Sequence, residues 1–232
     1  MNSFEDLKSQ LEQIHVEDGN QVMSSWSALG IKHGFLGVDQ ELPELNSCNQ
    51  VHGVAIAEAS EHTSFRSSAK PDADGVFTRN EGELVAVKTA DCVPVLFHNP
   101  KMVMAVHAGW KGLRSGILSQ ALKVFGDSKP LVAIGPHISS HSFEVGPEVL
   151  FEFSNSKQFA TDLQLCHISS KGHGDRWHLD LGIASVFSLI NAGAKAENIS
   201  LMRTCTKLNP NEWHSYRRDG LKAGRNWSWI SL

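Results

Sequence analysis

The sequence predicts an α+β fold with a mixed β-sheet, because strand and helix patterns follow one another irregularly along its 232 residues. Three apolar β-branched runs come in succession between residues 84 and 109, and helical patterns dominate much of the chain after residue 109. A doubly wound fold would show a regular alternation of strand and helix instead. Since no Pro-, Gly- or Ser-rich linker and no repeat divides the chain, we expect a single domain over residues 1–232.

The N-terminal half predicts one amphipathic helix and a group of strands. Apolar residues recur at helical spacing from Phe4 to Ile14, which predicts a helix over residues 3–14. The β-branched apolar runs predict strands at 84–92, 93–98 and 102–109, with Asn99, Pro100 and Lys101 separating the last two.

Gly, Pro and Asp residues mark the ends of the later elements. Gly126 can close a helix, Pro147 suits a first helical turn, and Asp180 can cap the helix that begins after it. The predicted helices cover residues 114–125, 147–158 and 181–192, and the predicted strands cover 131–136 and 199–202.

Composition excludes several classes of function. With 21 Lys and Arg against 25 Asp and Glu, the formal charge is -4, so the basic footprint of a nucleic-acid-binding protein is absent. No apolar run approaches the roughly 18 residues of a membrane helix. The acidic, amphipathic start lacks the regions of a signal peptide, so we expect a cytoplasmic protein with reduced cysteines and no membrane partner.

One pair of residues suggests a metal site. Cys92 lies seven residues before Asn99, and His107 lies seven residues after Pro100. If the two strands form a symmetric hairpin about that turn, Cys92 and His107 face each other with Cβ atoms roughly 4.5–5.5 Å apart. A thiolate and an imidazole at this separation can bind one zinc ion. The alternative is that Cys92 is a small core residue and His107 a structural one.

Spacing leaves the third ligand open. His52 is a candidate because the adjacent Gly53 permits close approach of the backbone, and His98 and His137 are alternatives. Three protein ligands would leave one position open, which is typical of catalytic zinc.

Several ordered motifs carry a family resemblance. They are NQVHG at 49–53, KTADC at 88–92, VHAGWKG at 106–112, GPHIS at 135–139, FEVG at 143–146, SYRRD at 215–219 and GR at 224–225. With these motifs the chain resembles, over roughly residues 49–232, the laccase-domain family. That family was long labelled multicopper polyphenol oxidase and is now described as purine nucleoside phosphorylase with adenosine deaminase activity. Some members are called peptidoglycan editing factors.

The resemblance implies a zinc ion held by His52, Cys92 and His107, with copper able to enter the same site in vitro. It implies layered mixed β-sheets flanked by helices, as in laccase-domain and cytotoxic-necrotizing-factor-like folds. It also implies phosphorolysis of adenosine, inosine, guanosine and 5′-methylthioadenosine, and deamination of adenosine. This chain departs from the family in a shorter segment before residues 49–53, which in the family carries an Arg and an Asn near the site.

Phosphorolysis requires a binding site for phosphate, and arginine suits that anion because its planar fork donates paired hydrogen bonds. Arg217 and Arg218 are the candidates, and we expect only one of these neighbours to face the site. Lys111 could also meet phosphate, Trp110 could stack on a purine, and His137 could bind ligand. The alternatives are a solvated pair of Arg218 with Asp219, a surface lysine, a core tryptophan and a buried histidine.

Deamination requires an activated water and a carboxylate that transfers protons. Asp74, in the segment DADG, and Asp91, beside Cys92, are the candidate catalytic residues. Turn capping is the alternative for Asp74. Asp91 would point away from Cys92 in an ideal strand, so a structural hydrogen bond is its alternative.

Three other functions compete with a purine nucleoside enzyme. A copper-dependent polyphenol oxidase of the multicopper type needs many histidines, and the chain has no His-x-His pair. A cysteine hydrolase or amidase in peptidoglycan editing would use Cys92 as nucleophile and His107 as base, and would keep that thiol free of metal. A non-enzymatic scaffold would keep zinc only for stability. The sequence leaves the preferred nucleoside and the oligomeric state open.

Overall fold

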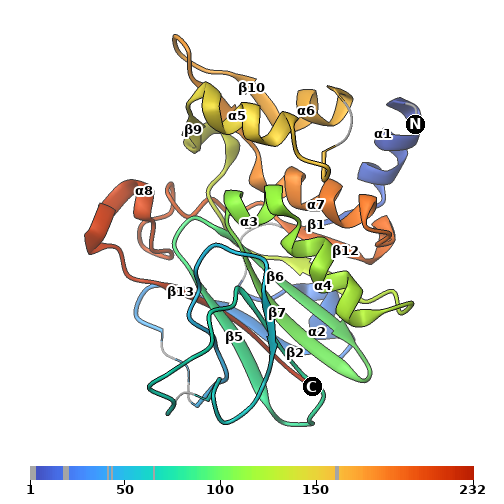
Figure 1. Ribbon diagram of the computed structural model, residues 1–232, viewed down its shortest axis with the longest axis vertical. Coiled ribbons are helices and arrows are strands. Elements are labelled where there is room, and N and C mark those ends of the chain that lie inside the picture. The colour runs from blue at the N-terminus through green and yellow to red at the C-terminus, as the bar shows by residue number, and fades with distance from the viewer. Residues whose placement is uncertain (1–3, 18–20, 41, 43, 65, 160–161) are drawn as a thin grey trace.

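The computed structural model describes residues 4–17, 21–40, 42, 44–64, 66–159 and 162–232 (Figure 1). The helices are α1 (Phe4–Glu12), α2 (Ser24–Ala28), α3 (Trp110–Ser115), α4 (Ile117–Phe125), α5 (Pro147–Ser154), α6 (Asp162–Ile168), α7 (Leu181–Asn191) and α8 (Tyr216–Asp219), with short 3-10 turns η1 (Ser140–Ser142), η2 (Ala196–Asn198) and η3 (Gly220–Lys222). The strands are β1 (His15–Glu17), β2 (Lys32–Leu36), β3 (Ile56–Glu58), β4 (Gly75–Thr78), β5 (Leu84–Thr89), β6 (Val93–Asn99), β7 (Met102–Ala108), β8 (Leu131–Ile134), β9 (Glu144–Val145), β10 (Ser169–Lys171), β11 (Trp177–Leu179), β12 (Ile199–Met202) and β13 (Asn226–Ser231).

The described strands form three sheets. The largest has seven strands in the order β1-β12-β8-β6-β7-β4-β3 and is mixed, with parallel pairs at both ends and antiparallel pairs in the middle. The sheet β2-β13-β5 is antiparallel, as is the sheet β10-β11-β9. The predicted α+β class with a mixed, layered arrangement is therefore confirmed.

The large sheet is buried on both faces, which explains why β7 is apolar throughout most of its length. Met102, Met104 and Val106 join a core shared with α3, α4 and α7, whereas Val103 and Ala105 belong to the core beneath the sheet β2-β13-β5. All seven residues of β7 are buried, because successive side chains point to opposite faces and both faces are covered. Figure 1 shows α3, α4 and α7 on one side of these central strands and the sheet β2-β13-β5 on the other.

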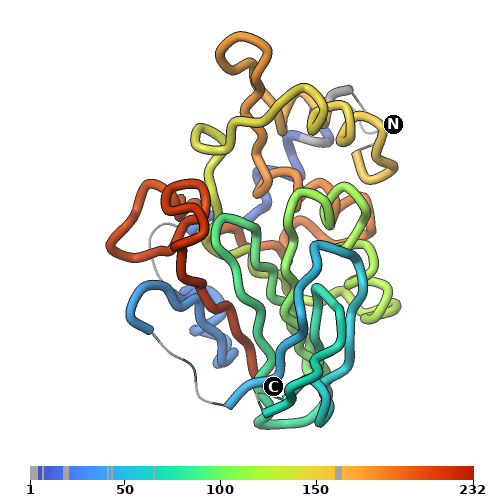
Figure 2. The backbone as a smooth tube through the Cα atoms, turned by 60° about the vertical axis from the view of Figure 1, so that its left-hand side comes forward, coloured from blue at the N-terminus to red at the C-terminus, as the bar shows by residue number. Residues whose placement is uncertain are grey.

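The C-terminal segment crosses the molecule to reach the sheet β2-β13-β5, which we call the small sheet. Figure 2 follows it, in red, through a wide loop that ends in β13. β13 then lies between β2 and β5 and pairs with both of them. Of the helices that the structure describes, none has the length and apolar character needed to cross a bilayer.

Several predicted boundaries need correction. The helix predicted at 114–125 is two helices, because α3 already begins at Trp110 and Gly116, with φ of 90°, interrupts the chain between α3 and α4. The helix predicted at 147–158 ends at Ser154. The cap at Asp180 is confirmed, since its carboxylate accepts the N–H of Ile183 at 2.9 Å.

The predicted hairpin register is wrong by two residues, because the centre of the turn lies one residue further along the chain. His107 pairs with Pro94 rather than with Cys92, and Asn99 pairs with Met102. The side chain of Asn99 accepts the N–H of Lys101 at 2.8 Å, which centres the turn on Pro100 and Lys101. The strand predicted at 84–92 ends at Thr89, so Cys92 lies in the corner between β5 and β6 instead of in a strand.

Candidate functional site

Three segments bring His52, Cys92 and His107 together. His107 lies on β7 and shares the face of Val103 and Ala105, toward the small sheet whose strand β5 ends at the Cys92 corner. The ligand atoms of the three residues all lie within 4.8 Å of one another. Cys92 Sγ is 4.0 Å from His52 Nε2, and the two imidazole rings are 4.8 Å apart, edge to face.

Gln50 holds the His52 segment beside β5. Its side-chain amide donates to the carbonyl of Lys88 at 2.7 Å and accepts the N–H of Lys88 at 2.8 Å. This reciprocal pair extends the edge of the small sheet to the NQVHG segment, so a glutamine two residues before the histidine fixes where the imidazole lies.

Asp74 is the buried centre of this arrangement. One carboxylate oxygen accepts from His107 Nδ1 at 2.7 Å and from the His52 N–H at 3.0 Å, and the other accepts from the Gly53 N–H at 2.6 Å. Asp74 is completely buried, so each of these bonds forms away from solvent. By binding Nδ1 of His107, Asp74 directs Nε2 toward Cys92, as an outer partner of a metal-ligating histidine does.

The local backbone makes room for the cluster. His52 adopts φ of 60°, a left-handed conformation, and the carboxylate of Asp74 holds the N–H groups around it. A Cβ atom at Gly109 would lie 2.9 Å from Cδ2 of His52 and 3.2 Å from Sγ of Cys92. The Gly in the VHAGWKG motif is therefore required by the close approach of both side chains.

The environment favours a charged thiolate. Burial would raise the pKa of Cys92, but hydrogen bonds with His107 and His52 outweigh it and lower that pKa to about 6. Burial would lower the pKa of His107, but Asp74 and Cys92 outweigh it and raise that pKa to about 9. Burial likewise opposes ionisation of Asp74, yet the bonds from His107 and Gly53 hold its pKa below the ordinary value.

These residues fit a metal ion. One sulfur and two nitrogens match the tetrahedral donor set of zinc, with expected bonds of about 2.3 Å to sulfur and about 2.0–2.1 Å to nitrogen. Copper accepts the same donors. Among the described residues, this is the one group of three or more His, Cys, Asp or Glu side chains close enough to hold an ion. His98 and His137, which spacing left as alternatives, lie outside it.

A cavity of about 480 Å³ opens over the cluster. Its wall combines cationic, aromatic and amide side chains around the three possible metal ligands. The remaining lining residues are Cys48, Asn49, Gln50, Lys88, Thr89, Ala90, Asp91, Phe143, Tyr216, Arg217 and Arg225. Its volume lies within the range typical of small-molecule sites.

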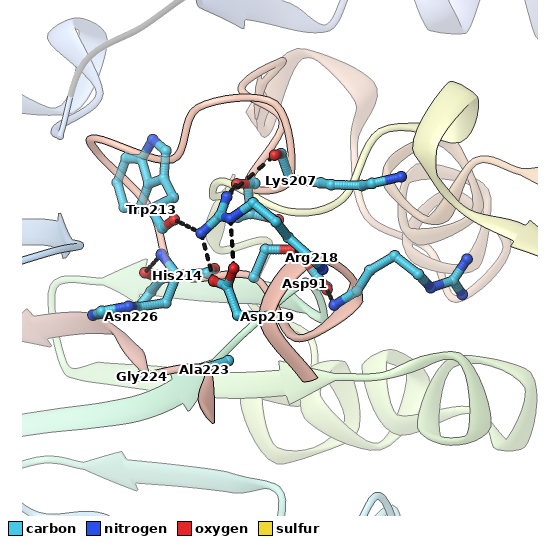
Figure 3. A network of polar contacts seen from close by, with 12 residues as sticks. Asp91, Lys207, Trp213, His214, Arg218, Asp219, Ala223, Gly224 and Asn226 are labelled. Carbon is cyan, nitrogen blue, oxygen red and sulfur yellow. Dashed lines mark hydrogen bonds and ion pairs between the residues drawn. The ribbon is translucent and has the colours of Figure 1, made fainter. Parts of the chain in front are cut away.

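Arg217 and Arg218 have different surroundings. Arg217 lines the cavity, with its guanidinium 5.0 Å from the Phe143 ring centroid and one Nη1–H donated to the Glu144 carbonyl at 2.9 Å. Arg218 is bound to the protein: it pairs with both carboxylate oxygens of Asp219 and donates to the carbonyls of Thr206, Lys207 and Trp213 (Figure 3). Only Arg217 of this pair contributes to the cavity wall.

Asp91 has both carboxylate oxygens engaged. One oxygen accepts a hydrogen bond from the Thr206 hydroxyl at 2.7 Å. The other accepts one from the backbone N–H of Arg217 at 2.6 Å. The residue is buried and adopts φ of 89°, so its side chain points away from Cys92 toward the C-terminal segment.

The other candidate substrate residues lie outside this cavity. Trp110 packs against the helical core at the start of α3, and Lys111 is exposed with its Nζ 5.7 Å from the Trp110 ring centroid. His137 is buried and lines a separate cavity with Asp180 and Arg203, and its Nδ1 donates to the Gly135 carbonyl at 2.8 Å.

Sequence reasoning missed part of the cavity wall. Phe143, Tyr216 and Arg225 all lie within motifs that carried the family resemblance, so the motifs marked them without assigning a role. Lys88 opens the KTADC motif, and Asn49 opens NQVHG. The alternation of side chains along a strand does not predict which of these residues face the cavity, because most of their segments are corners, turns or short helices.

Comparisons with known proteins agree on one family. Residues 13–232 match the family described as "Multi-copper polyphenol oxidoreductase laccase". A purine nucleoside phosphorylase of Bacteroides thetaiotaomicron is 37% identical over 167 residues, which cover 68% of this chain and 60% of that protein. The purine nucleoside phosphorylase YfiH of Escherichia coli (strain K12) is 35% identical, over 79% of this chain and 72% of that protein.

Other relatives carry other names. The adenosine deaminase RL5 from an unknown prokaryotic organism is 30% identical, over 84% of this chain and 77% of that protein. The crystal structure of a hypothetical protein YfiH from Bacillus licheniformis superposes with a TM-score of 0.73 at 28% identity, covering 80% of this chain and 73% of that one. The chain is thus shorter than these relatives and spans less than two thirds of the Bacteroides protein.

Proposed function

Because the chain belongs to the multi-copper polyphenol oxidoreductase laccase family, we propose that it is a zinc-dependent purine nucleoside phosphorylase. The observation that carries this proposal is the cavity itself: three possible metal ligands form its floor, and cationic and aromatic side chains surround them. The names of the relatives from Bacteroides thetaiotaomicron and Escherichia coli support the same activity. We propose adenosine, inosine, guanosine and 5′-methylthioadenosine as substrates.

Arg217 is the proposed phosphate-binding residue. Its guanidinium can donate paired hydrogen bonds to phosphate while one N–H stays bound to the Glu144 carbonyl. Arg225 and Lys88 also line the cavity and add positive charge to it, so Arg218 is not needed there as a second cation. They can replace the positive charge that the segment before residue 49 provides in the family and that is shortened in this chain.

Phe143 and Tyr216 are proposed to hold the purine. Aromatic rings provide flat apolar surfaces for a base, and both residues line the cavity beside Arg217. A phosphate oxygen bound at Arg217 would attack C1′ of the ribose, and the bond electrons would leave with the purine nitrogen. A zinc ion bound by His52, Cys92 and His107 would supply a Lewis acid to this cavity.

The two candidate carboxylates are proposed to act through other residues. Asp74 orients His107 and the His52 segment and does not line the cavity. Asp91 is the one carboxylate among the described residues lining the cavity, and both of its oxygens already accept hydrogen bonds. Adenosine deamination needs a carboxylate free to transfer protons, so we propose it as the weaker activity despite the name of the relative RL5.

The test is a product analysis on purified protein of measured metal content. Incubation with adenosine and phosphate is expected to give adenine and ribose 1-phosphate, with about one zinc ion per chain. Omission of phosphate should stop this reaction, whereas inosine formed without phosphate would indicate deamination. The absence of phosphate-dependent product from all four nucleosides in zinc-loaded protein would refute the proposal.

One observation favours a second candidate, a cysteine hydrolase. Cys92, His107 and Asp74 form a thiol–imidazole–carboxylate series, which is the arrangement of an activated nucleophile. In such an enzyme Cys92 would be free of metal and would form a covalent acyl intermediate. Metal-free protein that hydrolyses cell-wall peptides, and that loses this activity when zinc is added, would support the hydrolase over the phosphorylase.

A further inference from the structure

Asp91 occupies an unusual position in the backbone. It lies in the corner between β5 and β6 with φ of 89°, a conformation that side-chain-bearing residues rarely adopt. Its side chain is buried, with 8% of the residue exposed. Such a conformation persists only where surrounding contacts determine it.

Those contacts come from two distant parts of the chain. The Thr206 hydroxyl donates to Oδ1 at 2.7 Å across 115 residues, and the Arg217 N–H donates to Oδ2 at 2.6 Å across 126 residues. The main-chain carbonyl of Asp91 accepts the Ile138 N–H at 3.0 Å. One residue therefore joins the Cys92 corner to the segment after β8 and to the C-terminal segment.

Each joined segment contributes to the cavity wall. Cys92 directly follows Asp91 in the chain. Phe143 comes after Ile138, with the turn η1 between them, and the backbone N–H of Arg217 donates directly to the Asp91 carboxylate. The Arg217 side chain is held at its other end by the Glu144 carbonyl and the Phe143 ring. Asp91 thus fixes the backbone that carries the guanidinium of Arg217 into the cavity wall, beside Phe143 and in the same cavity as the possible metal ligands.

We infer that Asp91 is a positioning residue, which sets the distance of Arg217 from the His52–Cys92–His107 cluster and so determines the affinity for phosphate. This inference rests on the proposed phosphorylase function. We call the two hydrogen bonds from Thr206 and Arg217 to the Asp91 carboxylate the tether. Asp91 has no role in proton transfer in this proposal, because both of its carboxylate oxygens accept these bonds.

Two substitutions separate the tether from the other roles of the residue. Asp91→Asn keeps the tether, because the amide oxygen can accept the Arg217 N–H while the amide nitrogen donates to the Thr206 hydroxyl, which accepts as readily as it donates. Asparagine also tolerates the left-handed backbone. Asp91→Gly removes the tether yet suits the same backbone. Asn cannot carry a proton between substrate and water as a carboxylate does.

The experiment combines hydrogen exchange with kinetics in the full-length protein. Asp91→Gly should accelerate exchange of the Arg217 amide at least about tenfold, since that N–H loses its acceptor. It should raise KM for phosphate about tenfold with a smaller change in kcat, and zinc content should stay at about one per chain. Asp91→Asn should return both the exchange rate and KM to within about threefold of wild type.

Two controls keep the test decisive. Asp39→Gly removes another aspartate with positive φ, at 60°, that does not line the cavity, and it should change neither readout. Thr206→Val removes one of the two anchoring bonds without altering the corner, and it should accelerate Arg217 exchange by a smaller factor than Asp91→Gly. If Asp91→Gly fails to fold, Thr206→Val gives the same direction of change.

Three outcomes are distinguishable. Unchanged exchange of the Arg217 amide in both Asp91→Gly and Thr206→Val would overturn the tether. Loss of kcat in Asp91→Asn with slow exchange and unchanged KM would mean that Asp91 transfers protons, and would overturn the positioning role. If wild-type protein lacks phosphate-dependent activity, the proposed function fails, and slower exchange of Arg217 on addition of inorganic phosphate still tests whether the tethered residue binds that anion.

Discussion

The floor and the wall of the cavity are held in different ways. The floor is built around Asp74, which is completely buried and binds His107 and the His52 segment with short hydrogen bonds. The wall is assembled from several segments, and Asp91 joins the C-terminal one to the floor across more than a hundred residues of chain. Both regions depend on a buried carboxylate whose oxygens are occupied.

The two carboxylates, Asp74 and Asp91, differ in the groups that they position. Asp74 orients side chains that can bind a metal, so its loss should act on metal affinity. Asp91 positions a guanidinium that can bind an anion, so its loss should act on phosphate affinity. The comparison predicts that substitutions in the floor and in the wall change different measured constants.

Removing the thiol of the floor should have the largest effect. Cys92→Ala leaves two imidazoles, which bind zinc weakly, and loss of the metal removes several kcal/mol of transition-state stabilisation. We expect kcat/KM for phosphorolysis to fall about a thousandfold or more, with zinc content near zero by atomic absorption. Cys166→Ala, which changes an exposed cysteine of α6, is the matched control. Full activity in zinc-free Cys92→Ala would remove the metal from the proposed function.

The metal-free floor should also show a reactive thiol. Burial opposes ionisation of Cys92, but His107 and His52 lower its pKa to about 6, so the thiolate persists above that pH and is lost as pH falls through it. Alkylation of metal-free protein by iodoacetamide should therefore have its midpoint at a pH of about 6. Zinc should suppress the reaction.

Cys48 provides an internal comparison for this measurement. Its pKa is raised to about 11 by burial, so it should stay unmodified at neutral pH, as peptide mass spectrometry can show. An alkylation midpoint for Cys92 near the ordinary value of 9.0 would contradict the arrangement of the floor.

The floor and the wall also differ in how far the sequence predicted them. The strands β6, β7 and β12 follow from apolar runs, and Asp180 caps its helix as expected. The hairpin register was wrong because the Asn99 side chain moves the turn by one residue. Cys92 and His107 nevertheless meet, since the left-handed corner at Asp91 turns the chain back toward β7.

The wall could not be derived in this way. Which arginine of the SYRRD motif faces the cavity depends on acceptors at Thr206, Lys207 and Trp213, which lie in an irregular loop. Strand alternation indicates only that neighbours differ, and the motif in fact begins a short helix, α8. The occupied oxygens of Asp91 likewise depend on long-range contacts that no local pattern contains.

Weakening the support of the floor should have an intermediate effect. Asp74→Asn keeps the size of the side chain but presents an amide to groups that all donate hydrogen bonds to the carboxylate. We expect zinc affinity, measured by competition with a chelator, to fall about 10- to 100-fold. Asp72→Asn, an exposed neighbour in the same DADG segment, should leave zinc affinity unchanged. Equal affinities for both variants would show that Asp74 does not orient the ligands.

The smallest expected effects separate the two adjacent arginines of the wall. Arg217→Met should raise KM for phosphate about tenfold, because a charged hydrogen bond contributes roughly 1.5–3 kcal/mol, and should leave thermal stability near that of wild type. Arg218→Met should leave KM nearly unchanged and lower Tm, because the carbonyls of Thr206, Lys207 and Trp213 lose their shared donor.

Lys111→Met is the matched loss of a cation outside the cavity, and we expect it to change neither KM nor Tm. If Arg218→Met and Arg217→Met instead raise KM equally, the C-terminal segment moves as one unit and the assignment of phosphate to Arg217 alone is wrong. If only Arg217→Met does so, Arg217 is the arginine of the SYRRD motif that binds phosphate, and the neighbouring Arg218 serves to keep that segment folded.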